Sequence, residues 1–438
     1  MKEQSIFQIV VLAVFVVLFI LGFLGFSDKI PLPKGKGDVN YGEITFWGTL
    51  PAQTMNGVIE GKLRNDKSIA ITYVQKDKAT ISRELVEALA RGEGPDIFML
   101  SEDEILKNLD KVTLIPYETY SERAFKDAFI EEGELYLSSH GIAALPFIVD
   151  PLIMYWNRDI FTSAGIVTPP QRWSQFYAMT PKIVKKDENK NITRSFVSFG
   201  EYQNVSHAKD ILSTLIMQAG NAIILRKDGT LSADIFMNSG SQTPSASAVS
   251  FYTEFSRQEK DSYSWNRSLP VSRSMFEAGD LAVYFGFASE YRGIRERNPH
   301  LNFDVGVIPQ ADQTATKVTF AHMQAIAIPK AAKNPNGALY GAFILTTPEV
   351  IGSVVVATGL PPVRRDLLSI RQSDAVYSVF YESAVISRAW LDPSRDDTNV
   401  LFQRIINDVG TGQRKISEAL TILQNSMTKL LINYQTAL

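Results

Sequence analysis

The feature that most constrains this chain is an uninterrupted apolar stretch close to its N-terminus. Residues 6–26 (IFQIVVLAVFVVLFILGFLGF) carry no charge, and Gln8 is their one strongly polar side chain. At about 1.5 Å rise per residue, a helix over this stretch spans roughly 30 Å, the thickness of the hydrocarbon core of a bilayer. A core helix of a globular domain explains it poorly, because the stretch is terminal and apolar all round. The sequence therefore predicts a transmembrane helix over residues 6–26.

The residues after this stretch favour a retained anchor over a cleaved signal. A secretory signal usually has a shorter apolar region and small residues at its cleavage site, whereas this chain reads GFLGFSDK there. The chain contains no cysteine, so we expect no lipid-modified N-terminal cysteine. Lys2 precedes the stretch while Lys29, Lys34 and Lys36 follow it, so the lysine count does not place the N-terminus inside. Long domains cross membranes largely regardless of such charges, and orientation must come from the nature of the domain.

Composition limits what the remainder can be. Residues 27–42 form a polar tether containing Pro, Gly and Lys, and residues 43–438 are long enough for two lobes or domains. An apolar content of 45% and an aromatic content of 11% supply ample core. The net charge of −3 gives no basic footprint for nucleic acid, which we therefore exclude as a partner.

A β–α–β rhythm sets the fold class. β-rich runs occur at 43–49, 69–74 and 96–100, and a helical face of apolar residues occupies 81–89. Strands that alternate with helices in this way indicate an α/β protein with a parallel or mixed sheet. Residues 141–157 form one long extended run, broken by two prolines, that is typical of a strand crossing between lobes. From about residue 375 the pattern is helical, with a last helix over 416–434 and a loop expected at 392–399.

Eight phrases in a fixed order carry a family resemblance. They are ITFWGT at 44–49, GPDIFML at 94–100, LPFIVDPLIMYWNRDIFTSAGIVTPPQRW at 145–173, MFEAGDLAVYFGF at 275–287, FDVGVIPQ at 303–310, AIAIPKAAKNPNGALYGAFILTTPE at 325–349, GLPPVRRDLL at 359–368 and FQRIINDVGTGQRKISEAL at 402–420. Together they resemble the bacterial extracellular solute-binding proteins of ABC importers, in the group that includes the maltose-binding protein. The resemblance covers almost everything after the tether.

The resemblance implies a two-lobed periplasmic-binding-protein fold (type II) with hinge strands, here preceded by one transmembrane helix. Lobe 1 would take 43–149 plus 318–358, and lobe 2 would take 150–317 plus 359–438. Ligand would bind between the lobes, which close on it by hinge motion. It also implies that the large domain faces outside. A spanning helix in place of the usual lipoprotein cysteine is a departure from the family pattern.

Three candidate site residues follow from the resemblance and their positions. Trp47 ends the first predicted strand, where an α/β sheet presents its crevice, and its ring would suit the apolar face of a sugar. A Trp packed in the core is an equally good interpretation. Asp103 matches a ligand-contacting Asp of sugar-binding relatives, the alternative being an acidic residue favoured in the first turn of a helix. Asp150 matches a cleft carboxylate, and such a group is costly to bury without a partner.

The remaining candidates are aromatic or imidazole side chains. Only one of Tyr155 and Trp156 can face a given side of a strand, so one is expected in the core. The family's stacking position aligns with Ser289, so that platform is lost or shifted to a neighbour. A lone histidine such as His322 is more often structural than a ligand contact. For Trp390, packing in the core is the favoured alternative. The candidates are Tyr155, Phe285, Phe287, Tyr291, His322 and Trp390.

Enzyme signals are sparse. The sequence contains no H-E-x-x-H, G-x-S-x-G, P-loop or dinucleotide-binding motif, and its four histidines make no metal pattern. We expect no catalysis, cofactor or metal. A glycoside hydrolase that uses Asp103 and Asp150 as its carboxylate pair is the least favoured alternative.

The sequence and the resemblance together predict a membrane-anchored, extracytoplasmic, monomeric solute-binding protein. It would capture a small solute, a carbohydrate, for an ABC permease. A cationic solute such as a polyamine is the main alternative because candidate carboxylates line the expected cleft. A tethered sensor domain is another.

Overall fold

The computed structural model describes residues 40–434, except 65, 228, 237–243 and 313–315. The predicted anchor over 6–26, and the tether over 27–42 apart from its last residues, lie outside the described residues. Gly42–Leu438 forms one compact unit, and everything below concerns that unit. Among the described residues, no single helix is long and apolar enough to span a bilayer; helices α12 (Pro335–Leu345) and α13 (Pro348–Thr358) pass that test only as a pair, bent by 65°.

A mixed sheet organises the unit. Its strand order is β2-β1-β3-β13-β6-β11-β8-β7, with β12 added beside β6 and β14 beside β13. The bounds are β1 Gly42–Gly48, β2 Ile69–Gln75, β3 Ile97–Ser101, β6 Ala144–Asn157, β7 Lys185–Lys186, β8 Ile192–Val197, β11 Leu281–Phe287, β12 Phe303–Gly306, β13 Thr319–Ala327 and β14 Ser387–Arg388. The strands expected at 43–49, 69–74 and 96–100 are confirmed as β1, β2 and β3, and these three pair in parallel.

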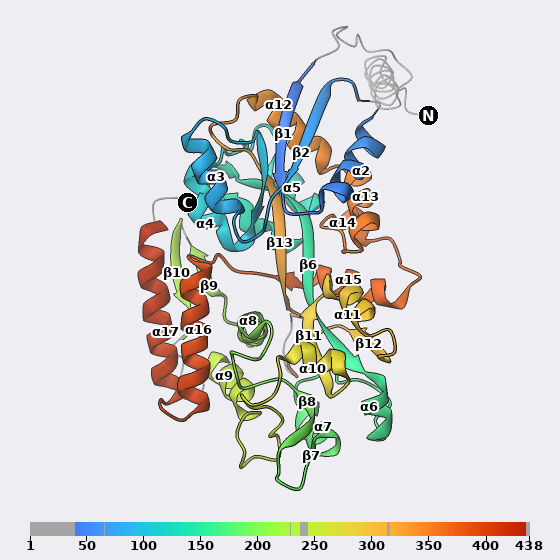
Figure 1. Cartoon of the computed structure of the whole chain (residues 1–438). Helices are drawn as coiled ribbons and strands as arrows, with labels where there is room; N and C mark the ends of the chain where they lie inside the picture. Colours follow the sequence, from blue (N-terminus) through green and yellow to red (C-terminus); the bar gives the residue numbers. More distant parts are fainter. Residues whose placement is uncertain (1–39, 65, 228, 237–243, 313–315, 435–438) are drawn as a thin grey trace, which may run out of the picture. The chain divides into compact units, whose positions relative to one another are not determined.

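Two long strands connect the two halves of this sheet (Figure 1). The C-terminal part of β13 pairs with both β3 and the start of β6. The second half of β6 then pairs with β11 and β12. The extended run expected at 141–157 is thus confirmed over 144–157 as one strand that takes part in both halves, whereas residues 141–142 form the short β5 (Gly141–Ile142) of a separate sheet. At the point where it changes neighbours, His322 of β13 lies opposite Asp150 of β6.

The first lobe carries β1, β2 and β3 with the helices α2 (Ala52–Leu63), α3 (Ile81–Ala90), α4 (Ile105–Asn108), α5 (Glu122–Ala128), α12 and α13. The helical face expected at 81–89 is confirmed, because Ile81, Leu85 and Ala88 of α3 are buried. α14 (Arg365–Leu368) also packs on this lobe: Ile130 N donates to Val363 O at 3.0 Å, and Arg365 Nε donates to Phe129 O at 2.6 Å. We therefore propose that the chain returns to the second lobe after Leu368.

The second lobe carries β8, β11 and β12 with helices on both faces. These helices are α6 (Arg158–Ser163), α7 (Gln175–Ile183), α8 (Ala208–Gln218), α9 (Pro244–Glu254), α10 (Ser272–Ala278), α11 (Glu290–Arg297), α15 (Ala375–Val385), α16 (Arg395–Gly410) and α17 (Ile416–Leu431). Its core is an aromatic cluster in which Phe176, Phe199 and Phe285 stack on one another and Trp173 packs against all three.

The C-terminal helices match the expected pattern with one correction. α17 covers most of the helix expected at 416–434, and it packs beside α16 (Figure 1). The loop expected at 392–399 is wrong beyond Ser394, because α16 begins at Arg395. Ser394 caps this helix by accepting a hydrogen bond from Asp397 N at 3.4 Å, and two aspartates occupy the first turn. Ser followed by acidic residues is a helix start signal, which the polar composition of the segment concealed.

Candidate functional site

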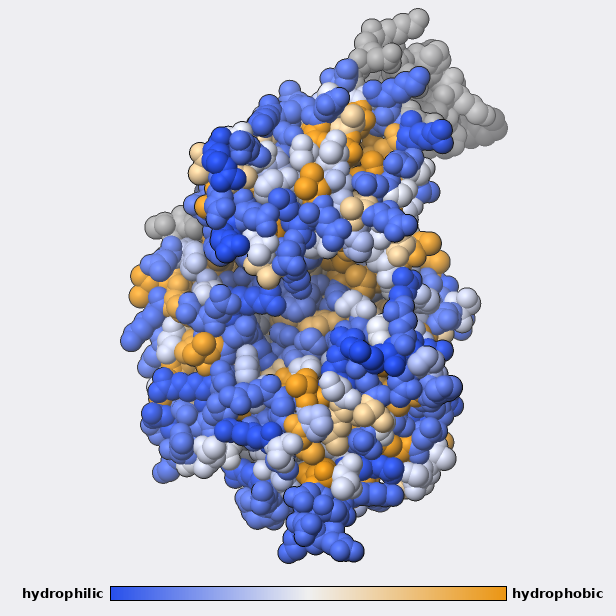
Figure 2. Space-filling view, viewed as in Figure 1, coloured by the Kyte–Doolittle hydropathy of each residue, from blue (hydrophilic) through white to orange (hydrophobic). Residues whose placement is uncertain are grey.

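A cavity of about 540 Å³ lies between the two lobes. The first lobe contributes the residues after β3, and the second contributes the start of α8, the turn from β11 to α11 and the start of α16; β13 forms the floor. Figure 2 shows hydrophilic side chains bordering the hollow between the upper and lower parts of this face. The cavity is therefore a polar interlobe cleft.

Charged groups of both signs dominate its wall. Six carboxylate side chains and six basic side chains line it: Glu102, Asp103, Asp150, Asp210, Glu290 and Asp392, with Lys78, His207, Lys209, Arg273, His322 and Arg395. Most of these groups already pair with one another. A solute can bind those charged groups of the wall that do not already form an ion pair.

Five of the nine side chains expected at the site from the sequence line this cavity. They are Asp103, Asp150, Phe287, His322 and Trp390. They come from five separate segments of the chain that the fold brings together. Their contact with a ligand stays a prediction.

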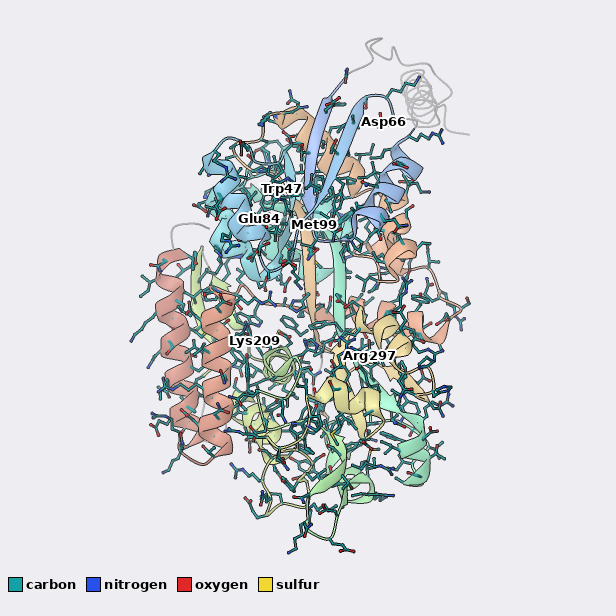
Figure 3. The ribbon with its side chains drawn as sticks, viewed as in Figure 1. Trp47, Asp66, Glu84, Met99, Lys209 and Arg297 are labelled. Atoms are coloured by element: carbon teal, nitrogen blue, oxygen red, sulfur yellow. The ribbon has the colours of Figure 1, made fainter. Side chains whose placement is uncertain are left out.

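The other four side chains lie away from the cavity. Trp47 is buried on β1, with Lys76 Nζ 3.8 Å above its ring centre, and Figure 3 shows it in the first lobe, apart from Lys209 on α8. Tyr155 is fully buried and donates its hydroxyl hydrogen to Phe287 O at 2.6 Å. Phe285 belongs to the aromatic core of the second lobe. Tyr291 packs against Phe303 and Phe380. Packing accounts for all four in this structure.

A buried acid–base pair lies at the floor of the cavity. Glu102 Oε1 lies 2.5 Å from His322 Nδ1, and Glu102 Oε2 accepts a hydrogen bond from Met323 N at 2.9 Å. Burial opposes the charge of each group, but their mutual attraction outweighs it, so the pKa of Glu102 is lowered and that of His322 is raised. Each group therefore favours the charged form of the other.

Asp103, next to that pair, is in a different electrostatic position. Burial, followed by the charge of Glu102, raises the pKa of Asp103 to about 6. The charge of His322, and then that of Arg395 of α16, which lies 3.5 Å away, partly offset this effect. Because Arg395 comes from the second lobe, this ion pair crosses the cleft.

Asp150 marks the lobe crossing and holds a backbone donor from the second lobe. Its Oδ1 accepts a hydrogen bond from Ser289 N at 2.9 Å. Burial raises the pKa of Asp150, and the hydrogen bond from Ser289 counteracts this. Among the described residues no Lys or Arg forms an ion pair with it, so this carboxylate remains available to a solute.

The start of α8 projects a second set of groups into the cavity. His207, immediately before α8, has a left-handed backbone (φ 61°), and its Nε2 lies 2.8 Å from Glu290 Oε1. Lys209 is buried and donates to Asp392 at 2.5 Å and to the hydroxyl of Thr398 at 2.7 Å. These contacts join α8 to α11 and α16 at the wall of the cavity.

The aromatic rings at the wall are largely covered by protein. Lys209 Nζ lies 5.0 Å from the centre of the Trp390 ring, and Phe402 stacks on the same indole at 6.1 Å. The centre of the Phe287 ring lies 4.4 Å from the ring centre of His322 and 4.7 Å from that of His207. Tyr202 is the half-buried cavity-lining ring for which no such covering partner occurs among the described residues. It is the better placed platform for stacking.

Sequence reasoning missed several of these cavity residues. The stretch after Gly200 has no strand or helix signal of its own, and it contains Tyr202, His207 and Lys209. Glu102 was passed over for its neighbour Asp103, although a carboxylate directly after a buried strand was a usable signal. Arg395 was lost in the segment interpreted as a loop.

Comparison with known proteins identifies the family. The family model described as "Bacterial extracellular solute-binding protein" matches residues 48–345, more than half of the chain. A binding protein of Brucella abortus (strain 2308) is 24% identical over 274 residues. That match covers 58% of this chain and 58% of the relative, so the chain spans little more than half of the length of the curated relatives it matches.

Solved structures show the same fold at low identity. The cyclic α-maltosyl-1,6-maltose binding protein of Arthrobacter globiformis superposes with a TM-score of 0.74 at 13% identity, covering 89% of this chain and 99% of its own. The sugar-binding protein MalE of Xanthomonas citri gives 0.70 at 16% identity, covering 89% and 98%. An ABC transporter solute-binding protein of Thermotoga lettingae bound with α-D-tagatose gives 0.64 at 20% identity, covering 89% and 99%. These similarities establish the two-lobed α/β fold.

Proposed function

Because this chain belongs to the family of bacterial extracellular solute-binding proteins, we propose that it captures a small polar solute, a carbohydrate, in the cavity between its lobes and delivers it to an ABC permease. The observation that carries this proposal is the convergence of both lobes on one polar cavity of about 540 Å³, with Asp103 and Asp150 in its wall. That volume is in the range of small-molecule sites. Solved structures of the same fold include sugar-binding proteins and one bound with a sugar, which supports the choice of solute.

The cavity offers the contacts that a sugar needs. Tyr202 supplies a ring for the apolar face of a pyranose, and Asp150 supplies a charged acceptor for hydroxyl groups. A hydrogen bond to a charged group contributes about 1.5–3 kcal/mol. A neutral solute held this way leaves the existing ion pairs of the wall undisturbed.

A cationic solute is the second candidate, and one observation favours it. Asp150 has no Lys or Arg ion-pair partner among the described residues, while Lys209 and Arg273 each pair with a carboxylate. An ammonium group at Asp150 would give this carboxylate a counter-charge. A polyamine fits this description.

A thermal-unfolding screen of the full-length chain separates these candidates. The protein is kept in a detergent without a sugar headgroup, and maltotetraose, mannobiose, tagatose and spermidine are added separately. A solute that binds only the folded state stabilises it by about 2.7 kcal/mol when present at 100 times its Kd. Stabilisation by a sugar supports the proposal, stabilisation by spermidine alone supports the second candidate, and no response to any solute of either class contradicts both.

Product analysis tests binding against catalysis. After prolonged incubation with the stabilising saccharide, the proposal expects the saccharide to be recovered intact. Hydrolysis that is lost in both the Asp103→Asn and Asp150→Asn variants would replace the binding function with a glycoside hydrolase.

We propose that residues 6–26 anchor the protein in the cell membrane, with the large domain on the extracytoplasmic side. Two features support this: the stretch is uncharged and long enough to span a bilayer, and it ends in phenylalanines where a signal-peptide cleavage site needs small residues. Intact-mass measurement of the membrane-extracted protein checks the anchor, and protease accessibility of whole cells checks the side. A mature N-terminus between residues 23 and 42 would contradict the anchor. Membrane association with a separate signalling protein, and no neighbouring permease, would favour a tethered sensor.

A further inference from the structure

A small hairpin outside the main sheet reaches from the second lobe to the first. It consists of β9 (Ile223–Lys227) and β10 (Thr230–Asp234), which, within the part of the chain that the structure describes, pair only with each other. At its far end, Gln424 of α17 accepts hydrogen bonds from Ile235 N at 3.0 Å and Phe236 N at 2.7 Å. The hairpin is therefore fixed to the C-terminal helices of the second lobe.

Arg226 of this hairpin binds backbone carbonyls of the first lobe. Its Nη1 donates to Leu137 O at 2.5 Å, and its Nη2 donates to Glu134 O at 3.4 Å. The guanidinium is half-buried, and this burial lowers its pKa. A planar guanidinium that reaches two carbonyls at once fixes both distance and orientation.

The first-lobe side of this contact is itself rigidly held. Leu137 and Glu134 belong to the segment formed by the 3-10 helix Glu131–Tyr136 and β4 (Leu137–Ser138). Tyr136 donates its hydroxyl hydrogen to Leu100 O of β3 and lies 3.0 Å from Met323 O of β13. Tyr117 donates to Ser138 O at 2.6 Å. The segment that Arg226 binds is thus hydrogen-bonded to the central sheet of the first lobe.

The base of the hairpin is strained. Ile223 has a positive φ of 49° although it is β-branched and fully buried. β-branched residues rarely adopt this conformation, and strain of this kind persists only where the surroundings impose it. It lies three residues before Arg226, where the chain turns from α8 into the hairpin.

From these contacts we propose that the hairpin Ile223–Asp234 is an interlobe strap that restrains lobe opening in the solute-free protein. The restraint comes from the hydrogen bonds of Arg226 to the first lobe. The strap borders a second cavity of about 540 Å³ lined by Glu131, Arg226 and Arg388 among others, and this cavity shares Trp390 with the solute cavity. Arg388 adds an ion pair to Glu131 on the same side. The strap acts at the edge of the hinge, beyond the solute cavity, and does not depend on which solute is bound.

The absence of cysteine from the sequence makes a clean test available. Single cysteines replace Val86 of α3 and Val400 of α16, which are 41% and 61% exposed, and carry spin labels. Pulsed dipolar spectroscopy then gives the distribution of distances between the two lobes in the full-length chain without any added solute. We expect Arg226→Ala to displace this distribution to longer distances and to broaden it.

Lys227→Gln is the matched control, because it removes a positive charge from the same hairpin at an exposed side chain. Its distance distribution should equal that of the spin-labelled chain in which Lys227 is unchanged. Arg226→Met keeps the apolar stem and removes the guanidinium, so it repeats the test if Arg226→Ala unfolds. If Arg226→Met folds, as judged by circular dichroism, and its distribution is unchanged, the strap is disproved. The proposal is also disproved if Lys227→Gln shifts the distances as much as the Arg226 variants do.

Discussion

Glu102 and His322 form a buried acid–base pair where β3 and β13 lie side by side, with 2.5 Å between Glu102 Oε1 and His322 Nδ1. Glu102 is 2% exposed at its side chain, and Met323 N holds its second oxygen. The pair forms the floor of the interlobe cavity next to Asp103 and the lobe crossing at Asp150. Its ionisation state therefore sets the local charge of the site.

The first prediction concerns the pH dependence of this pair. The pKa of Glu102 is lowered, so its contribution to stability is complete above the ordinary value of 4.5 and is lost as pH falls through the folded pKa. The pKa of His322 is raised, so its contribution is complete below the ordinary value of 6.5 and is lost as pH rises through the folded pKa. Both contributions are complete between pH 4.5 and 6.5. Glu102→Gln should cost about 3–5 kcal/mol in that window, the cost of removing one partner of a buried pair.

Urea unfolding of both proteins across pH measures this difference. The His322 ring protons followed by NMR should show a lower pKa in Glu102→Gln than in the unmodified chain. A stability difference that does not change with pH would contradict the pairing.

The second prediction concerns Glu132, a buried carboxyl whose two oxygens have no hydrogen-bond partner within ordinary geometry among the described residues. Burial raises its pKa from 4.5 to about 8. A raised folded pKa means that stability is complete below pH 4.5 and declines as pH rises towards 8. Glu132→Gln removes the ionisation and should stabilise the protein on the order of 3 kcal/mol at pH 7, with a smaller effect at pH 5.

Denaturant unfolding at pH 5 and pH 8 compares the two proteins. Glu134→Gln is the matched control, because Glu134 is a partly exposed carboxylate two residues away. A stabilisation that is no larger at pH 8 than at pH 5 would contradict the raised pKa of Glu132.

The third prediction concerns Trp47, which the structure places in the core of the first lobe, outside the solute cavity. Trp47→Ala should lower the free energy of unfolding by about 3–5 kcal/mol, as expected for a buried Trp. Under conditions where the variant is folded, its affinity for the stabilising solute should not change. Calorimetric titration checks the affinity, and an affinity loss with normal stability would return Trp47 to the site as a stacking platform.

The fourth prediction concerns Asp150, whose carboxylate faces the cavity and holds Ser289 N. Asp150→Asn keeps an acceptor and removes the charge. Affinity for a sugar should fall by about tenfold, equivalent to about 1.4 kcal/mol, the difference between a charged and a neutral hydrogen bond. A cationic solute loses its counter-charge in this variant, so its affinity should fall much further.

Titration calorimetry on Asp150→Asn therefore also discriminates between the two solute classes. The unfolding free energy of the variant should stay close to that of the unmodified chain, since the acceptor for Ser289 N remains. Unchanged affinity for every solute that binds would remove Asp150 from the site.

Local patterns in the sequence were enough to predict the elements that carry strong periodicity. The strands β1, β2 and β3, the helix α3 and the long strand β6 follow from alternating or continuous apolar runs, because burial of those faces is imposed wherever such elements pack. The order of the family phrases added the two-lobed arrangement. It also pointed to Asp103, Asp150, Phe287 and His322, which the fold gathers around one cavity together with Trp390, a candidate for which packing was the favoured alternative.

Only the tertiary structure decided which aromatic rings are covered and which charges are paired. Trp47, Tyr155 and Phe285 look like site residues in sequence because an aromatic ring serves a core and a sugar platform equally well. Their burial depends on neighbours far away in the chain, such as Lys76 above Trp47 and Trp173 beside Phe285. In the same way, the pairing of Glu102 with His322 joins residues 220 positions apart. The sequence determined the elements and the family, since these depend on local pattern and order, whereas contacts between distant segments exist only once β6 and β13 bring the two lobes together.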